Sequence, residues 1–107
     1  MSAKTVLKGN ELTVYLTGEI DHHSARKIRE MTDSMIQQSQ PGMLRLNFSG
    51  VSFMDSSGIG LIMGRYRMMK LYGGELRVIN VPPGLRRIME MSGLGSLNVL
   101  ESEVESL

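Results

Sequence analysis

The sequence predicts an α/β domain with a mixed sheet of four to five strands and helices packed mainly on one face. Three observations predict it. Apolar and polar residues alternate in several short segments, which is the period of half-buried strands. Longer segments between them repeat apolar residues every three to four positions, which is the period of helices. Glycine and proline pairs separate the segments, so the expected order is β-β-α-β-α-β-α.

The first 43 residues predict a hairpin followed by a helix. Residues 5–7 and 12–16 alternate on either side of Gly9-Asn10, a pair typical of hairpin turns. Asp21 or Ser24 is expected to cap the helix. The sequence Pro41-Gly42 ends this helix, and its apolar stripe consists of Ile28, Met31, Met35 and Ile36.

The remaining residues predict a strand at 44–53, a helix at 57–71 and a strand at 76–80. A short helix starts at Pro82-Pro83, and residues 97–100 fit a short last strand. Helical crossovers between strands imply parallel neighbours and right-handed connections. The apolar residues of the third helix are Leu85, Ile88 and Met89, with Gly93 as its cap.

The helix at 57–71 has two contrasting sides. Its core side is expected to consist of Ile59, Ile62, Met63, Tyr66 and Met69. Gly60, Gly64 and Arg67 fall on another side, and Leu61 and Met68 flank the glycines. A glycine inside a helix costs about 1 kcal/mol relative to alanine. Either the protein's own structure or a partner is therefore expected to approach this side closely.

Composition excludes several functions. The 107 residues fit one domain, residues 1–107, and a net charge of +1 gives no footprint for nucleic acid or an anionic membrane. The chain has no apolar segment long enough for a signal peptide or a membrane span. Cysteine is absent, which excludes disulfides and thiol catalysis and is compatible with a cytoplasmic protein.

The sequence Asp55-Ser56-Ser57-Gly58 is the main functional candidate. It ends an apolar strand and starts a helix, so two hydroxyls lie beside backbone N–H groups that lack internal partners. Such a position can hold a phosphate. The same four residues are also a common capping cluster at a strand-to-helix turn, which needs no further function.

Enzymatic alternatives fit the sequence poorly. A serine hydrolase would need a Gly-x-Ser-x-Gly elbow and an oxyanion loop, although Asp21, one of the histidines and Ser56 could form a triad if their loops are adjacent. Adjacent His22 and His23 point apart on a helix start and have no third ligand, so no metal is expected. No Walker-type loop is present, and an aspartyl-phosphate receiver would require a lysine at a later strand end.

Several segments together resemble a known family. Phe53-Met54-Asp55-Ser56-Ser57-Gly58-Ile59-Gly60 with Gly64-Arg65-Tyr66 is similar to the signature of bacterial anti-sigma-factor antagonists of the STAS fold. The segments Gly18-Glu19-Ile20-Asp21-His22-His23, Gly73-Gly74-Glu75 and Met91-Ser92-Gly93-Leu94 fit as well and narrow the resemblance to the sporulation branch. Asp21-His22-His23 and Gly64-Arg65-Tyr66 are the segments that favour this branch over the general-stress branch. The resemblance spans residues 12–97. Only seven residues follow Leu100, which is too few for the full last helix of that family.

The resemblance implies a regulatory protein without catalysis, cofactor or metal. The unmodified antagonist would bind an anti-sigma factor that is also an ATP-dependent serine kinase, and so release sigma-F. The kinase would phosphorylate Ser56, and a PP2C-type phosphatase would restore the protein. A general-stress antagonist with a different kinase is the alternative. Free antagonist is expected to be a cytoplasmic monomer that binds neither nucleic acid nor membrane.

The expected partner-binding surface combines the two loops with the glycine side of the second helix. Asp21 and Asp55 would make both loops acidic, so that a phosphate on Ser56 repels an acidic partner. The residues expected to bind the partner are Asp21, His22, His23, Asp55, Ser57, Gly58, Gly60, Leu61, Gly64, Arg67 and Met68.

Overall fold

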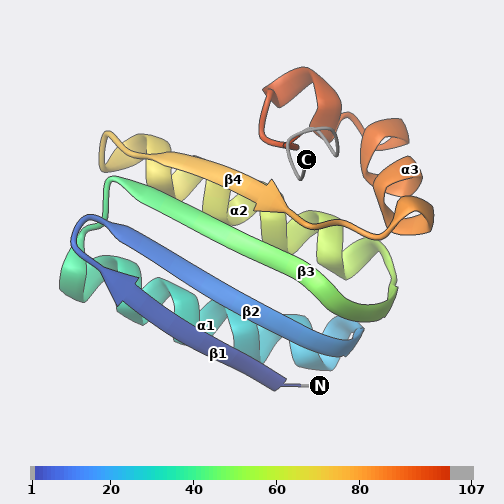
Figure 1. The fold of residues 1–107 in the computed structure, drawn as a ribbon, viewed down its shortest axis with the longest axis horizontal. Helices are drawn as coiled ribbons and strands as arrows, with labels where there is room; N and C mark the ends of the chain where they lie inside the picture. Colours follow the sequence, from blue (N-terminus) through green and yellow to red (C-terminus); the bar gives the residue numbers. More distant parts are fainter. Residues whose placement is uncertain (1, 102–107) are drawn as a thin grey trace.

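The four strands form one mixed sheet in the order β1-β2-β3-β4 (Figure 1). The computed structural model describes residues 2–101. The strands are β1 (Ser2–Lys8), β2 (Glu11–Ile20), β3 (Met43–Met54) and β4 (Glu75–Ile79). β1 pairs with β2 in antiparallel fashion, and β2, β3 and β4 are parallel neighbours. The predicted hairpin, element order and mixed sheet are confirmed.

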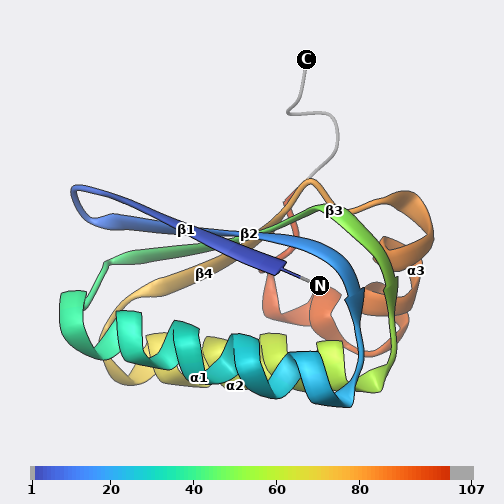
Figure 2. The ribbon, with the colours of Figure 1, turned by 90° about the horizontal axis from the view of Figure 1, so that it is seen from below.

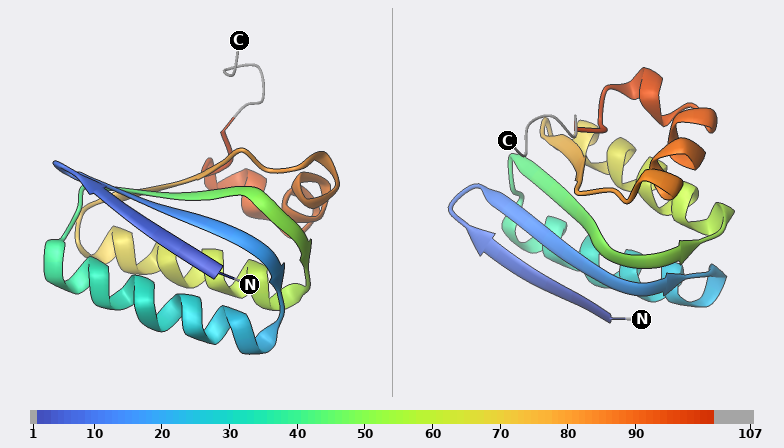
Figure 3. Two further views of the ribbon diagram at one scale, coloured as in Figure 1. Left: turned by 60° about the horizontal axis from the view of Figure 1, so that its bottom comes forward. Right: turned by 45° about the vertical axis from the view of Figure 1, so that its right-hand side comes forward.

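Two crossover helices cover one face of the sheet. Figure 2 shows α1 (His22–Ser39) and α2 (Ser56–Leu71) side by side below the strands, both starting at the same end. Within residues 2–101, no helix lies on the opposite face. The third helix, α3 (Pro83–Met91), and a 3₁₀ helix, η1 (Leu94–Leu97), lie beyond β4 (Figure 3). The expected packing of helices mainly on one face is confirmed.

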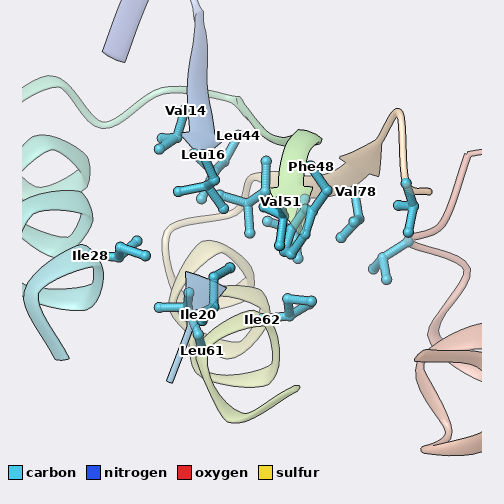
Figure 4. Packing of buried hydrophobic residues seen from close by; sticks show 14 of the residues in the cluster. Val14, Leu16, Ile20, Ile28, Leu44, Phe48, Val51, Leu61, Ile62 and Val78 are labelled. Atoms are coloured by element: carbon cyan, nitrogen blue, oxygen red, sulfur yellow. The ribbon is translucent and has the colours of Figure 1, made fainter. Parts of the chain in front are cut away.

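The hydrophobic core lies between the sheet and the two crossover helices (Figure 4). Alternating residues of the strands point into it, as their two-residue period predicts. Burying apolar area of this kind contributes roughly 25 cal/mol per Å² to folding. The fully buried residues of the strands and of α1 include Leu12, Val14, Ile20, Ile28, Ile36, Leu44, Leu46, Phe48 and Val78.

The C-terminal part differs from expectation. Residues 97–100 do not form a strand, and only a single parallel bridge joins Leu100 to Val78. The preceding residues form η1, and Asn98 takes a left-handed φ of 58°, so an extended segment cannot start earlier. Ile88 is 46% exposed instead of lying in the core. The acidic tail at 102–107, and any last helix there, lies outside the described residues.

Candidate functional site: two loops at the helix starts

The loops before α1 and α2 lie next to each other at one edge of the sheet. Ile20 and Met54 are paired residues at the ends of the parallel strands β2 and β3. The Asp55 N–H donates a hydrogen bond of 3.1 Å to the Ile20 carbonyl, which links the two loops directly. Parallel neighbours end at the same edge, so residues that are 34 positions apart form one surface. The predicted proximity of the loops is confirmed.

Asp55 is the N-cap of α2 and occupies the amides that a phosphate would need. Its Oδ1 accepts a 2.8 Å hydrogen bond from the Ser57 N–H. Its carbonyl accepts a 3.0 Å bond from the Gly58 N–H. The expectation of free amides at this helix start is therefore wrong at both positions. A phosphate here would meet an occupied cap and a neighbouring carboxylate.

The two serines of the motif have different environments. Ser56 is exposed at the first position of α2, one residue earlier than the predicted helix start. Ser57 is half-buried, faces the groove between α1 and α2, and serves the first turn through its backbone N–H. Ser56 is thus the more accessible hydroxyl of the pair.

Asp21 caps α1 in a reciprocal arrangement with Ser24. The Ser24 N–H donates to Asp21 Oδ1 at 2.8 Å, and the Asp21 N–H donates to Ser24 Oγ at 2.9 Å. Hydrogen bonding of the carboxylate, first to the Ser24 backbone N–H and then to the Ser24 side chain, lowers the pKa of Asp21 from its ordinary value of 3.8. Asp21 is consequently a carboxylate at neutral pH, and it is exposed together with His22 and His23.

The glycine side of α2 is narrower than predicted. Gly60 and Arg67 are exposed and Gly64 is half-buried, as expected of an outward side. Leu61 is only 4% exposed and lies in the core beside Ile20 (Figure 4). It is buried because α2 packs against α1 as well as against the sheet, although it still lines part of the space between these two helices. Met68 is half-buried and packs on the core.

Gly58 is also a packing residue. It is buried, and a Cβ atom at this position would clash with Cγ and Sδ of Met54. Its absent side chain therefore serves the packing of the α2 start. By contrast, a Cβ on Gly60 or Gly64 would have no other atom within 4 Å. The packing of the described residues therefore does not require a glycine at either position.

Arg65 is the polar residue that sequence reasoning missed. It is 7% exposed, and its Nε lies 2.8 Å from Oδ1 of Asp33 on α1. That distance makes an ion pair, yet the N–H direction gives neither atom a hydrogen bond. A further N–H of Arg65 donates to the Leu61 carbonyl at 3.3 Å. A signal within α2 could not have revealed the pair, because its partner lies on another helix.

A groove of about 500 Å³ separates α1 from α2 and opens beside the two loops. Glycines form part of one wall, and arginines of both helices contribute positive charge. The lining residues are His22, Ala25, Arg26, Arg29, Ser57, Gly60, Leu61, Gly64 and Arg65.

Other kinds of site find no support in residues 2–101. This part of the chain contains no group of three or more His, Asp or Glu side chains placed to hold a metal ion. None of the helices described here combines the length and the apolar character needed to cross a membrane. Although Asp21 and Ser56 lie on adjacent loops, no hydrogen bond within residues 2–101 joins His22 or His23 to Ser56.

The site is thus an exposed serine at the capped start of α2, next to the capped start of α1, in a domain whose sheet is covered by helices on one face. The STAS domain model matches residues 2–107, and the chain belongs to this family.

Among relatives, the chain is 40% identical to the anti-sigma F factor antagonist of Paenibacillus polymyxa over 97 residues, 90% of this chain and 83% of that protein. It is 33% identical to the anti-sigma-B factor antagonist of Bacillus subtilis, over 90% of this chain and 86% of that protein. The resemblance to the sporulation branch is confirmed.

The fold matches the anti-sigma factor antagonist SpoIIAA, solved in two forms. The unphosphorylated form gives a TM-score of 0.84 at 31% identity, covering 98% of this chain and 92% of that chain. The phosphorylated form gives 0.76 at 31% identity, covering 98% and 96%.

Proposed function

We propose that the protein is an anti-sigma-factor antagonist whose unphosphorylated form binds an anti-sigma factor and thereby releases sigma-F. The observation that carries the proposal is Ser56, exposed where the Asp21 and Asp55 loops meet, in a chain of the STAS family. Relatives at 40% and 33% identity bear the name of antagonist. The protein itself is a cytoplasmic binding module, monomeric when free, and not an enzyme.

The proposed switch is phosphorylation of Ser56 by the anti-sigma factor, which acts as a serine kinase, and its reversal by a PP2C-type phosphatase. Accessibility favours Ser56 over Ser57, which is half-buried and follows the cap. A phosphoserine adds a charge of about −1.5 to −2 at neutral pH. Because the amides of Ser57 and Gly58 already bind Asp55, they would neutralise little of that charge, and an exposed phosphate would face the partner.

Local repulsion is large enough for release. At an effective dielectric constant of about 20, two like unit charges about 5 Å apart repel by roughly 3 kcal/mol. A hundredfold loss of affinity requires only about 2.7 kcal/mol. One partner carboxylate near the phosphate therefore suffices, and no rearrangement of the fold is needed.

The proposed docking surface keeps the exposed and half-buried members of the predicted set, except Met68, which packs on the core. These are Asp21, His22, His23, Asp55, Ser57, Gly60, Gly64 and Arg67. Gly58 and Leu61 act beneath it by fixing the start and the position of α2.

Phosphopeptide mapping tests the switch. Incubation with the anti-sigma F factor of Paenibacillus polymyxa and ATP should place phosphate on Ser56, and a Ser57→Ala variant should still be modified. Ser56→Ala should bind the kinase permanently, and Ser56→Asp should bind poorly. Phosphate on Ser57 of the wild-type protein would contradict the assignment.

A leucine scan of two glycines tests the docking surface. Gly64→Leu places a branched side chain where a partner would approach, and should weaken kinase binding more than it lowers the melting temperature. Gly84→Leu is the matched control, since Gly84 is an exposed helical glycine of α3 whose Cβ would also meet open space. Equal affinity of both variants would remove Gly64 from the interface.

A general-stress antagonist is the second candidate, because a relative at 33% identity is an anti-sigma-B factor antagonist. Offering the protein the anti-sigma-B factor of Bacillus subtilis in parallel with the anti-sigma F factor distinguishes the two. Tighter binding and faster phosphorylation with the former would favour the general-stress function. Turnover of an ester substrate without any partner would instead indicate an enzyme.

A further inference from the structure

The groove between α1 and α2 carries an unusual concentration of positive charge for a chain of net charge +1. Its lining includes Arg26, Arg29 and Arg65, and no lining residue is acidic. Arg26 has Glu30 as a partner at 3.9 Å, but both side chains are well exposed and such pairs contribute little. Within residues 2–101, Arg29 has no ion pair.

Arg65 places a guanidinium at the groove, and its contacts with described residues use only part of its hydrogen-bonding capacity. The group has five N–H donors, and two contacts to described residues are present, with Asp33 and with the Leu61 carbonyl. Burial lowers the pKa of Arg65, Asp33 opposes this shift, and the charge of Arg29 adds to it. Both arginines line the same groove, so an anion bound between them would be favourable.

The α2 wall of the groove allows the backbone of a partner to approach closely. Gly60 and Gly64 lie one helical turn apart on α2, with open space where their Cβ atoms would be. A partner backbone can therefore come near enough for its short acidic side chains to reach Arg29 and Arg65. The groove also begins at His22 and Ser57, so it continues directly from the proposed docking surface.

We propose that this groove binds an acidic segment of the anti-sigma factor, with Arg29 and Arg65 contacting its carboxylates and the two glycines admitting its backbone. The proposal rests on the proposed function, because it names the chemistry of the partner at the same surface. It also gives the phosphate its target: an acidic segment drawn to the arginines is the group that a charge on Ser56 repels.

Charge variants of Arg29 test the proposal without disturbing the core, because Arg29 is exposed on α1. The measurement is the affinity for the anti-sigma F factor of Paenibacillus polymyxa as a function of salt. Arg29→Ala should weaken binding about fivefold, the effect of losing one exposed pair of about 1 kcal/mol. Arg29→Glu should weaken it at least about twentyfold, since like charges face each other. Arg29→Lys should keep most of the affinity.

Lys8→Glu is the control for net charge, because Lys8 is exposed at the hairpin, at the opposite end of the sheet. It should bind like the wild type, and the salt dependence of Arg29→Glu should be weaker than that of both. If Arg29→Glu binds as tightly as Lys8→Glu, the acidic segment is refuted while the antagonist function stands. If the wild-type protein itself does not bind, the proposed function is refuted and the inference with it.

Discussion

The three glycines of α2 should respond to alanine in opposite directions. Gly58 is buried under Met54, and a Cβ there would clash with Cγ and Sδ of that side chain. Gly60 and Gly64 have no atom within 4 Å of the same position. None of the three has a positive φ, so alanine meets no backbone strain at any of them. The differences between the variants therefore report packing alone.

The expected sizes follow from these contacts. Gly60→Ala and Gly64→Ala should each raise the free energy of unfolding by about 0.8–1 kcal/mol, the helix propensity difference. For a chain of this size each should raise the melting temperature by about 4 °C. Gly58→Ala should instead lower stability by about 1 kcal/mol, because overpacking costs about 1–3 kcal/mol and exceeds the propensity gain.

Urea titration at constant temperature, with thermal unfolding as a second measurement, compares the three variants. Equal m-values would show that the native and unfolded states keep their compactness, so that shifts of the midpoint measure stability. Lower stability of Gly64→Ala would mean that the α1–α2 groove is filled in solution. Higher stability of Gly58→Ala would mean that Met54 leaves its place at no cost, and either result refutes the reasoning.

Three further predictions concern charges. Asp21→Asn should lose stability relative to the wild type above pH 3.8, and the difference should vanish as the pH falls through the lowered pKa of Asp21, as acid titration of the melting temperature can show. Asp33→Ala should lower the free energy of unfolding by about 1–3 kcal/mol, because it strands the buried Arg65, whereas Arg65→Met should cost less in the same urea titration, since Asp33 is 30% exposed. Phosphorylation of Ser56 should shift amide NMR signals only in the two loops and the adjacent groove, and shifts throughout the sheet would indicate a conformational switch.

Local patterns were sufficient to predict most of the fold. The alternation of Leu12, Val14 and Leu16 placed β2 correctly, because one face of the sheet packs against helices and the other does not. The sequence left Asp21 or Ser24 open as the first cap and placed a capping cluster at residues 55–58, and the caps proved to be Asp21 and Asp55. Such signals are legible because capping depends on residues within one turn. The adjacency of the two loops followed from the parallel crossover alone.

Tertiary packing explains what the sequence could not reveal. A helical wheel assigns one buried side, whereas α2 contacts both the sheet and α1, so Leu61 appeared to be a surface residue. The pairing of Arg65 with Asp33 joins two helices across 32 residues of sequence and leaves no local trace. The strand predicted at residues 97–100 does not form, because η1 and the left-handed Asn98 occupy the positions that would have to be extended.

The geometry of the site favours a switch in which attraction and repulsion act on the same partner group. Asp55 already binds the amides of Ser57 and Gly58, so these two N–H groups would contribute little to neutralising a phosphate on Ser56. The arginines that could attract an acidic partner line the groove, whereas Ser56 is not one of its lining residues. A partner segment in the groove would lie beside the start of α2, because Ser57, the residue after Ser56, is part of the lining. A phosphate on Ser56 would repel the same carboxylates that the arginines attract. Release would then need no change in the hydrophobic core.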